Sequence, residues 1–446
     1  MTGRYHLKRF VRLAKRGMHV HTQSITARHV GVIVACCLQC GIPVAMIIST
    51  PGVFYPVMAN DLGVQTAEVS AWMSVAMLSC AAFSPVIGNM LGRFRLRSMR
   101  VSAVIVAGAA MAVFSMATAP WMFWLAAVFM GYVLVLLTSL GPATLVNRWY
   151  QERVGALMGL YAAFTAIGGV VFLMVGQAII EASGWRAAYF AFAVISWVVG
   201  LPVELLLTRE RPQECGLLPY GAELGNANEA LSTTTGTAPE GNVAIREADL
   251  LMRTAPFWLL FVCGFLMNLV CQINGYFPKY VMWIDEQAAE GIVAGAFVTG
   301  AVLASVCQAG SAVGKIGLGM FSDFSVRKAT MALAACGAVG VACVWQVPAT
   351  FLMVAGGFAF GFFIAGVLVL LPMLCRQIFG AGEVYPVIYA RIAVAPTLGG
   401  AVGNIVWPYL ADNLGGFDAV FGVALVCIVL VLITALIALS GTSDRS

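Results

Sequence analysis

The sequence predicts an all-α integral membrane protein with twelve transmembrane helices in two six-helix halves. Of its 446 residues, 61% are hydrophobic and only 10% are charged, whereas soluble domains carry about 25% charged residues. Long apolar runs recur along the chain, and each can supply the roughly 20 helical residues that cross a bilayer. A membrane β-barrel is excluded because its strands are about ten residues long and alternate apolar with polar side chains.

Twelve apolar runs define the expected spans. They cover residues 30–58, 69–91, 99–118, 121–146, 155–181, 185–207, 256–283, 291–318, 329–346, 350–378, 384–411 and 417–440. The stretch between the sixth and seventh runs is polar and cannot bury enough apolar surface to fold alone. The expected parts are therefore a basic tail (1–29), an N-terminal half (30–207), a linker (208–254), a C-terminal half (255–440) and a C-terminus (441–446).

The basic residues predict the orientation. All but four of the 25 Lys and Arg lie in segments on the same side of the membrane as the N-terminus, including the loop with Arg93, Arg95, Arg97 and Arg100. The four exceptions are Arg186, Lys279, Lys315 and Arg391. Because positive loops stay inside, we expect a multi-pass protein of a bacterial inner membrane with both termini in the cytoplasm, and we assign the tail to anchoring rather than to nucleic-acid binding or a signal peptide.

The two halves repeat. An offset of about 230 residues carries the glycine motif that starts at Gly88 onto the one that starts at Gly319, each at the cytoplasmic end of the second span of its half. Internal duplication of this kind is typical of secondary transporters. Prolines in corresponding spans, such as Pro43 and Pro278, predict kinks.

The two glycine motifs resemble the signature of the major facilitator superfamily, which reads G-x-x-x-D-R-x-G-R-R. The first copy has Gly92 in place of the acidic residue, and the second has Phe324 in place of the arginine. The resemblance implies alternating access, with a gate formed by these loops and by a basic residue that ends the fourth span. The expected gating residues are Gly88, Arg93, Arg97, Arg148, Gly319, Asp323, Arg327 and Lys328. From helical spacing alone, we expect Arg148 to pair with Glu152.

Three further segments are similar to bacterial monocarboxylate porters and oxalate/formate antiporters. These are the turn at Asn147–Tyr150, the turn at Gly184–Arg186 and the linker start RERPQECGLLPYG. The resemblance implies a carboxylate substrate, bound by a basic residue four positions before Gly319 and by another in the eleventh span. Those positions hold Lys315 and Arg391.

Lys315 and Arg391 also stand out without any resemblance, because a charge within the bilayer costs at least about 2.5–3.5 kcal/mol. Each lies eight residues from the end of its span, which is about 12 Å from the cytoplasmic boundary. We find no Asp or Glu at that depth in either half, so we expect both cations to face one cavity and a substrate anion to lie between them. In the alternative interpretation, Lys315 extends to the interface and Arg391 caps carbonyl groups near Pro396.

Polar and aromatic residues in the spans complete the expected substrate site. Tyrosine offers an apolar wall and one hydroxyl, which suits a small carboxylate, although an aromatic residue in a span more often packs or marks the interface. The candidates are Tyr389, Tyr161, Tyr132, Asn268, Gln272 and Tyr276.

Other functional classes have less support. All four histidines lie in the first 29 residues, so an enzyme with a catalytic triad or a zinc site is not expected. We assign Cys36, Cys37 and Cys40 to packing rather than to a metal, and we expect no disulfide and no cofactor. A proton-coupled multidrug exporter would need an intramembrane acid. A non-transporting solute sensor would need a large extramembrane domain.

The expected function is therefore secondary transport of a small mono- or dicarboxylate. We favour uniport or anion exchange because no acid lies at the centre and Ser311 stands where related porters carry Asp. The expected partners are the carboxylate, the lipid bilayer and a counter-transported anion or proton, without nucleic acid, and we expect a monomer.

Overall fold

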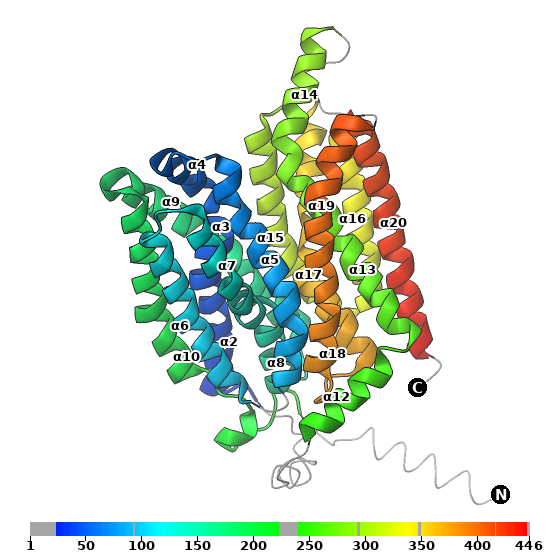
Figure 1. The fold of residues 1–446 in the computed structure, drawn as a ribbon. Helices are drawn as coiled ribbons and strands as arrows, with labels where there is room; N and C mark the ends of the chain where they lie inside the picture. The colour runs from blue at the N-terminus through cyan, green and yellow to red at the C-terminus, as the bar shows by residue number, and fades with distance from the viewer. Residues whose placement is uncertain are drawn as a thin grey trace, which may run out of the picture.

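The computed structural model describes residues 24–91, 94–222, 240–291, 295–346, 349–414 and 416–443. Within these ranges the regular secondary structure is helical, and one isolated bridge joins Tyr150 and Tyr220. The predicted basic tail, Gly92 and the gating candidate Arg93 lie outside the described residues. Figure 1 shows two groups of helices side by side, one from each half of the chain.

The N-terminal group contains six spans, several of them broken into shorter helices. Its elements are α2 (Ala27–Gln39), η1 (Cys40–Val44), α3 (Ala45–Ser49), α4 (Pro51–Leu62), α5 (Thr66–Met90), α6 (Leu96–Ser115), α7 (Pro120–Leu134), η2 (Val135–Ser139), α8 (Leu140–Trp149), α9 (Val154–Ile195), η3 (Ser196–Gly200) and α10 (Leu201–Leu207).

The C-terminal group repeats this arrangement. Its elements are α13 (Ala255–Cys271), η7 (Gln272–Tyr276), α14 (Phe277–Ala289), α15 (Gly300–Phe324), α16 (Val326–Gln346), α17 (Phe351–Phe379), α18 (Tyr385–Ile392), α19 (Val394–Asn413) and α20 (Gly416–Ser443).

The prediction of twelve spans is confirmed. The described residues contain 11 apolar helical segments long enough to cross a membrane, and one of them, Val154–Leu207, has 54 residues. At 1.5 Å per residue it would measure about 81 Å, far more than the bilayer core of about 30 Å. Gly184 divides this segment, because its φ of 83° and ψ of 166° are not helical. The segment therefore supplies both the fifth and the sixth span.

Prolines account for several of the breaks within spans. Pro43 lies inside the π-helical turn η1, and Pro51 is the first residue of α4. In the seventh span, the 3₁₀ turn η7 precedes Pro278 at the start of α14. A proline has no N–H to donate and its ring clashes with the preceding turn, so the kinks predicted in the first and seventh spans are confirmed.

The linker is more structured than its composition suggests. It contains η4 (Pro212–Cys215) and α12 (Glu240–Leu251). Its first part docks on the N-terminal half, where Leu218 is buried and the Tyr220 N–H donates to the Trp149 carbonyl. Its last part docks on α18, with Ala248 buried. The linker thus gains its order from surfaces of the two halves rather than from a core of its own.

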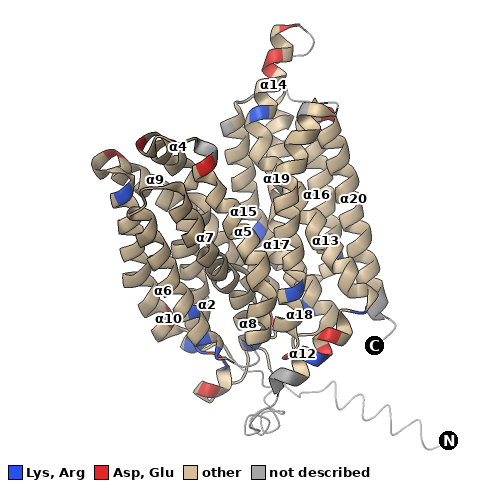
Figure 2. Cartoon of the chain, viewed as in Figure 1, with Lys and Arg blue, Asp and Glu red and all other residues tan. Residues whose placement is uncertain are grey.

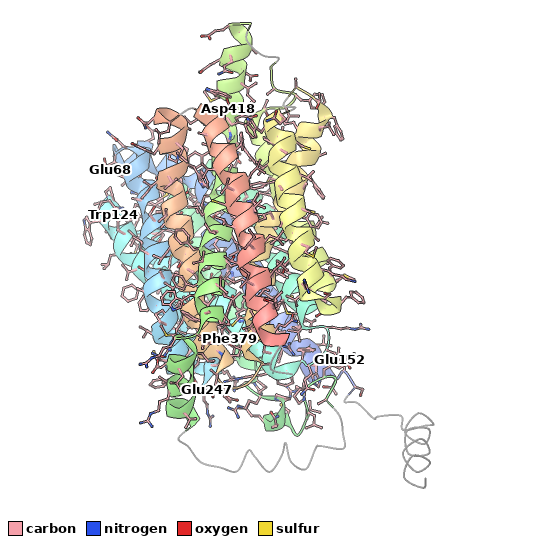
Figure 3. The ribbon with its side chains drawn as sticks, turned by 90° about the vertical axis from the view of Figure 1, so that its right-hand side faces the viewer. Glu68, Trp124, Glu152, Glu247, Phe379 and Asp418 are labelled. Carbon is pink, nitrogen blue, oxygen red and sulfur yellow. The ribbon has the colours of Figure 1, made fainter. Side chains whose placement is uncertain are left out.

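The two halves meet mainly where α9 packs against α15 and where α5 packs against α18 and α19. In Figure 1 the halves converge at the end that holds α8, α12 and α18, and they separate toward the end that holds α4 and α14. We call the first the linker end. Figure 3 shows Glu152 and Glu247 toward the linker end and Glu68 and Asp418 toward the opposite end.

Candidate functional site

The contact between the halves is closest where α9 crosses α15. A Cβ atom on Gly159 would overlap the Lys315 carbonyl oxygen, and one on Gly155 would overlap the Gly319 carbonyl oxygen. Small residues of this kind let two membrane helices approach until their backbones touch. The gating candidate Gly319 therefore lies directly in the interface between the halves.

Asp323 continues this contact toward the linker end. Its carboxylate accepts hydrogen bonds from the backbone N–H groups of Gly155 (2.6 Å) and Ala156 (2.9 Å), at the first turn of α9. A carboxylate at a helix N-terminus pairs with free N–H groups and with the positive end of the helix dipole. Asp323 on the C-terminal half thus caps a helix of the N-terminal half.

Lys315 lies on the same face of α15, four residues before Gly319 and eight before Asp323. Its side chain is only 9% exposed, and its Nζ donates a hydrogen bond to Thr165 Oγ1 on α9 at 3.1 Å. Among the described residues no carboxylate lies within ion-pair distance of this ammonium group. The fold therefore places an enclosed positive charge between the halves with a neutral hydroxyl as its acceptor.

Two of the predicted tyrosines lie on helices that form the boundary between the halves. Tyr161 on α9 and Tyr389 on α18 are both buried. The ring of Tyr389 stacks on that of Tyr385, with 5.5 Å between centroids. The structure therefore brings Lys315, Tyr161 and Tyr389 to the boundary between the halves, together with Thr165, which the sequence argument did not identify.

The crossing of α5 and α18 forms the second contact at the linker end. Ser84 Oγ donates to the Ala390 carbonyl at 2.7 Å, and a Cβ on Gly88 would overlap the Ala390 side chain. The gating candidate Gly88 thus permits close approach here, as Gly319 does at the other crossing.

Arg391 has a different environment from the expected one. Its Nη1 lies 2.7 Å from Asp249 Oδ1 and 2.9 Å from Met252 Sδ, and both partners come from the linker. Successive helical residues are turned by about 100°, so Arg391 faces α12 while Ala390 faces α5. Lys315 and Arg391 thus have separate partners in this structure, and the anion beside Arg391 is a carboxylate of the chain itself.

The remaining substrate candidates make contacts inside one half. Tyr132 bonds to Ser102 Oγ at 2.7 Å. Asn268 Nδ2 donates to the Pro396 carbonyl at 2.6 Å, and Gln272 Nε2 donates to Asn268 Oδ1 at 3.3 Å. Tyr276 donates to the Asn404 carbonyl at 2.9 Å. The last three candidates thus bind the backbone of α19 or each other.

The other gating candidates lie at the linker end. Arg148 pairs with Glu210 at 2.8 Å and approaches Glu383 at 3.6 Å, which joins the N-terminal half to the linker and to the C-terminal half. The expected pair with Glu152 is therefore wrong, because these two carboxylates are brought closer by the fold. Arg97 donates to the Leu205 carbonyl, while Arg327 and Lys328 are exposed.

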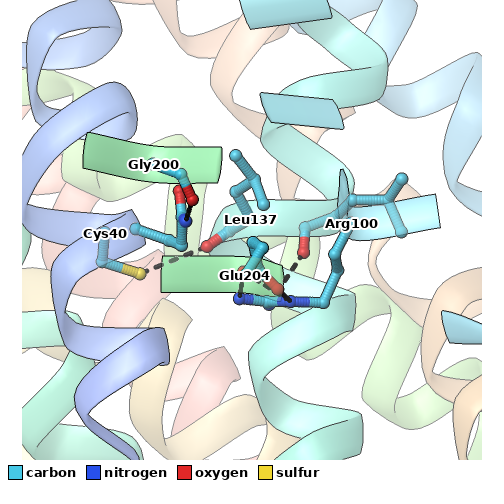
Figure 4. Close-up of polar contacts among 7 residues, drawn as sticks. Cys40, Arg100, Leu137, Gly200 and Glu204 are labelled. Carbon is cyan, nitrogen blue, oxygen red and sulfur yellow. Dashed lines mark hydrogen bonds and ion pairs between the residues drawn. The ribbon is translucent and has the colours of Figure 1, made fainter. Parts of the chain in front are cut away.

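One buried ion pair was not predicted from the sequence. Arg100 belongs to α6 rather than to a loop, and its Nε lies 3.0 Å from Glu204 Oε1, with both side chains fully enclosed (Figure 4). Figure 2 shows that Lys, Arg, Asp and Glu otherwise gather mainly at the two ends of the bundle. Both residues fall within predicted spans, so a search for opposite charges inside spans would have found them.

Three π-helical turns surround this pair. Arg100 Nη1 donates to the Leu136 carbonyl at 3.2 Å, Cys40 Sγ to the Leu137 carbonyl at 3.2 Å, and Gln39 Nε2 to the Gly200 carbonyl at 2.8 Å. All three carbonyls belong to η2 or η3 (Figure 4). Side chains thus satisfy the backbone groups that wide turns leave free inside a membrane protein.

Comparison with known proteins agrees with this architecture. A sequence model described as "Major Facilitator Superfamily" matches residues 38–353. The chain is similar in structure to a Major Facilitator Superfamily transporter, FucP, in the outward conformation, with a TM-score of 0.64, 13% identity, and coverage of 92% of this chain and 98% of that chain. It is also similar to the proton:xylose symporter XylE bound to 6-bromo-6-deoxy-D-glucose, with a TM-score of 0.67, 14% identity, and coverage of 92% and 95%. No curated protein sequence matches the chain.

Proposed function

Because the chain belongs to the Major Facilitator Superfamily, and is thus a transporter rather than an enzyme, we propose that it carries a small organic anion, a mono- or dicarboxylate, by alternating access. The proposed mode is uniport or anion exchange across a bacterial inner membrane. The linker end is then the cytoplasmic end, and the contacts at Gly155, Gly319, Gly88 and Ala390 are those of a carrier that is closed to the cytoplasm.

The observation that carries the proposal is the environment of Lys315. An enclosed ammonium without a carboxylate partner is costly, since burying a charge is tolerated mainly when it is paired. A substrate carboxylate would supply that partner at the boundary between the halves. Tyr161 and Tyr389 would contribute apolar ring surface and hydroxyl groups nearby. Because their contacts lie within one half, Tyr132, Asn268, Gln272 and Tyr276 are proposed to shape the site rather than to bind the carboxylate.

Arg391 has a later role in this proposal. In the present state Arg391 forms an ion pair with Asp249, so Lys315 makes the first contact with the substrate. Arg391 can bind the substrate carboxylate only after α12 has moved and Asp249 has left. An internal carboxylate at this position keeps the arginine neutralised while no substrate is present.

The alternative function, a proton-coupled exporter, requires an acidic residue within the membrane. Glu204 is an intramembrane acid of the kind that proton-coupled export needs, but Arg100 engages its carboxylate fully. The sugars named for XylE, xylose and 6-bromo-6-deoxy-D-glucose, belong to that protein. Because this chain is only 13% and 14% identical to the two structural neighbours, we do not propose sugars as substrates. Sugars serve instead as controls for specificity.

Ligand-induced thermal stabilisation of the purified protein tests the proposed substrate class. The panel contains small mono- and dicarboxylates, neutral sugars and cationic drugs. We expect a carboxylate to raise the melting temperature, because a ligand stabilises the state that binds it. Lys315→Gln should abolish this shift, whereas Lys279→Gln, which removes the charge of an exposed lysine on α14, should keep it. Stabilisation only by a sugar or a cationic drug would refute the anion proposal, and a ligand that stabilises but is not transported would indicate a sensor.

A further inference from the structure

The bond between Lys315 and Thr165 is buried and joins the two halves of the protein. Lys315 belongs to the C-terminal half and Thr165 to the N-terminal half, 150 residues earlier in the sequence. Opening of the carrier at the linker end must break this bond together with the contacts of Gly155 and Asp323. Of these contacts, only that of Lys315 is made by a cation for which a substrate anion can compete.

The geometry of Thr165 shows that its hydroxyl is oriented to accept. Thr165 Oγ1 donates its proton to the Ala162 carbonyl at 2.7 Å, one turn earlier on α9. A hydroxyl has one proton and two lone pairs, so the side that faces Lys315 is an acceptor only. Thr165 thus serves as the neutral partner of the ammonium group while no anion is bound.

A carboxylate is a stronger acceptor than a hydroxyl. Both bonds have the ionised ammonium group as donor, but only a carboxylate adds the attraction of an opposite charge, which is strong where water is excluded. A bound carboxylate therefore takes Lys315 away from Thr165, and the two halves lose one of the bonds that hold the linker end closed. The substrate thereby favours the open state, because it replaces a contact that exists only in the closed state. A ligand shifts a conformational equilibrium only through such a difference between the two states.

We propose that the bond from Lys315 to Thr165 is a tether that closes the empty carrier, and that a substrate carboxylate releases it. The empty carrier then reorients slowly and the loaded carrier quickly. Such a carrier performs exchange of one anion for another rather than uniport. This inference rests on the proposed anion substrate and adds Thr165 as the residue that sets the mode of transport.

Transport by protein reconstituted in liposomes tests the tether. The vesicles contain radiolabelled oxalate or lactate, and the loss of label is measured into buffer without carboxylate (net efflux) and into buffer with the same carboxylate (exchange). For the wild-type protein we expect exchange to exceed net efflux. Thr165→Val should raise net efflux relative to exchange about tenfold, as expected for the loss of one hydrogen bond to a charged group.

Two variants serve as controls. Thr165→Ser keeps the acceptor and should retain the wild-type ratio. Thr144→Val also removes a buried threonine hydroxyl that bonds within its own helix, in this case to the Leu140 carbonyl at 2.7 Å, but it has no contact with Lys315. An unchanged ratio in Thr165→Val, or an equal change in Thr144→Val, would refute the tether. Absence of any carboxylate transport by the wild-type protein would instead refute the proposed function.

Hydrogen exchange gives a second test that needs no substrate. The N–H groups of Gly155 and Ala156 are protected by Asp323 only while the linker end is closed. In the substrate-free protein, Thr165→Val should increase deuterium uptake in the peptide that contains them, whereas Thr144→Val should not. Equal uptake in Thr165→Val and wild type would show that the tether does not hold the carrier closed.

Discussion

Arg100 on α6 and Glu204 on α10 form an ion pair in which neither side chain is exposed, although 104 residues separate them. The Glu204 carboxylate accepts from both Nε and Nη2 of Arg100. Removal of one partner leaves an enclosed charge without compensation, which costs about 3–5 kcal/mol. We therefore expect Glu204→Gln to lower the stability of the N-terminal half by that amount.

The double variant Arg100→Met, Glu204→Leu is the matched test of this pair. It removes both charges together, so we expect it to be more stable than either single variant in thermal unfolding of the purified protein. If the single variants unfold at the wild-type temperature, an uncompensated charge at this position is not costly and the prediction is wrong.

Gly159 supplies a second prediction, because a Cβ at this position would overlap the Lys315 carbonyl oxygen. Gly159→Ala should prevent the halves from closing at the linker end and reduce transport at least tenfold. Each half keeps its own packing, so the protein should remain folded and its α9 N-terminal amides should exchange faster. The control is Gly52→Ala, for which the added methyl group meets open space. Normal transport by Gly159→Ala would contradict the close crossing.

The pair between Arg391 and Asp249 gives a third prediction. Asp249 is 59% exposed and Arg391 is 10% exposed, so the bond is worth about 1 kcal/mol. Asp249→Lys should detach α12 from α18, seen as faster hydrogen exchange across Glu240–Leu251. The double variant with Arg391→Asp should restore protection. Glu247→Lys, on an exposed position of the same helix, should leave it unchanged.

A fourth prediction concerns pH at the end opposite the linker. Hydrogen bonds from Arg186 and Trp185 hold the pKa of Asp61 below its ordinary value. A carboxylate whose pKa is lower in the folded state adds stability above the ordinary pKa of about 3.9 and loses that contribution as the pH falls through the folded value. Asp61→Asn should therefore lower the melting temperature slightly at pH 7 and have a smaller effect at pH 3. An equal effect at both values would contradict an ionic contact.

Much of the fold could be predicted from the sequence because it depends on local properties. The length of each apolar run determines a span, and prolines such as Pro43 and Pro278 determine where spans bend. Gly184 ends one span and Trp185 begins the next, as the turn between the predicted fifth and sixth spans required.

The partners of individual charges could not be predicted in this way, because they depend on which helices the fold brings together. The charge of Lys315 within a span was recognised as unusual, but its acceptor Thr165 lies in the other half of the protein. Arg391 was expected to face a substrate, and the carboxylate beside it comes from a linker whose composition suggested no structure. Arg100 was counted with a loop because it lies near the start of its span, and its partner Glu204 was overlooked near the end of another.

The docking of the linker defines where the polypeptide can be divided. The segment up to Ala222 is fixed to the N-terminal half through Tyr150, Tyr220 and His29, whereas α12 is fixed to the C-terminal half through Arg391. A gene cut between Ala222 and Glu240 would give two polypeptides that each keep their own linker piece. Such fragments should reassemble when co-expressed, whereas a cut at the predicted half boundary after residue 254 would separate Asp249 from the arginine it neutralises.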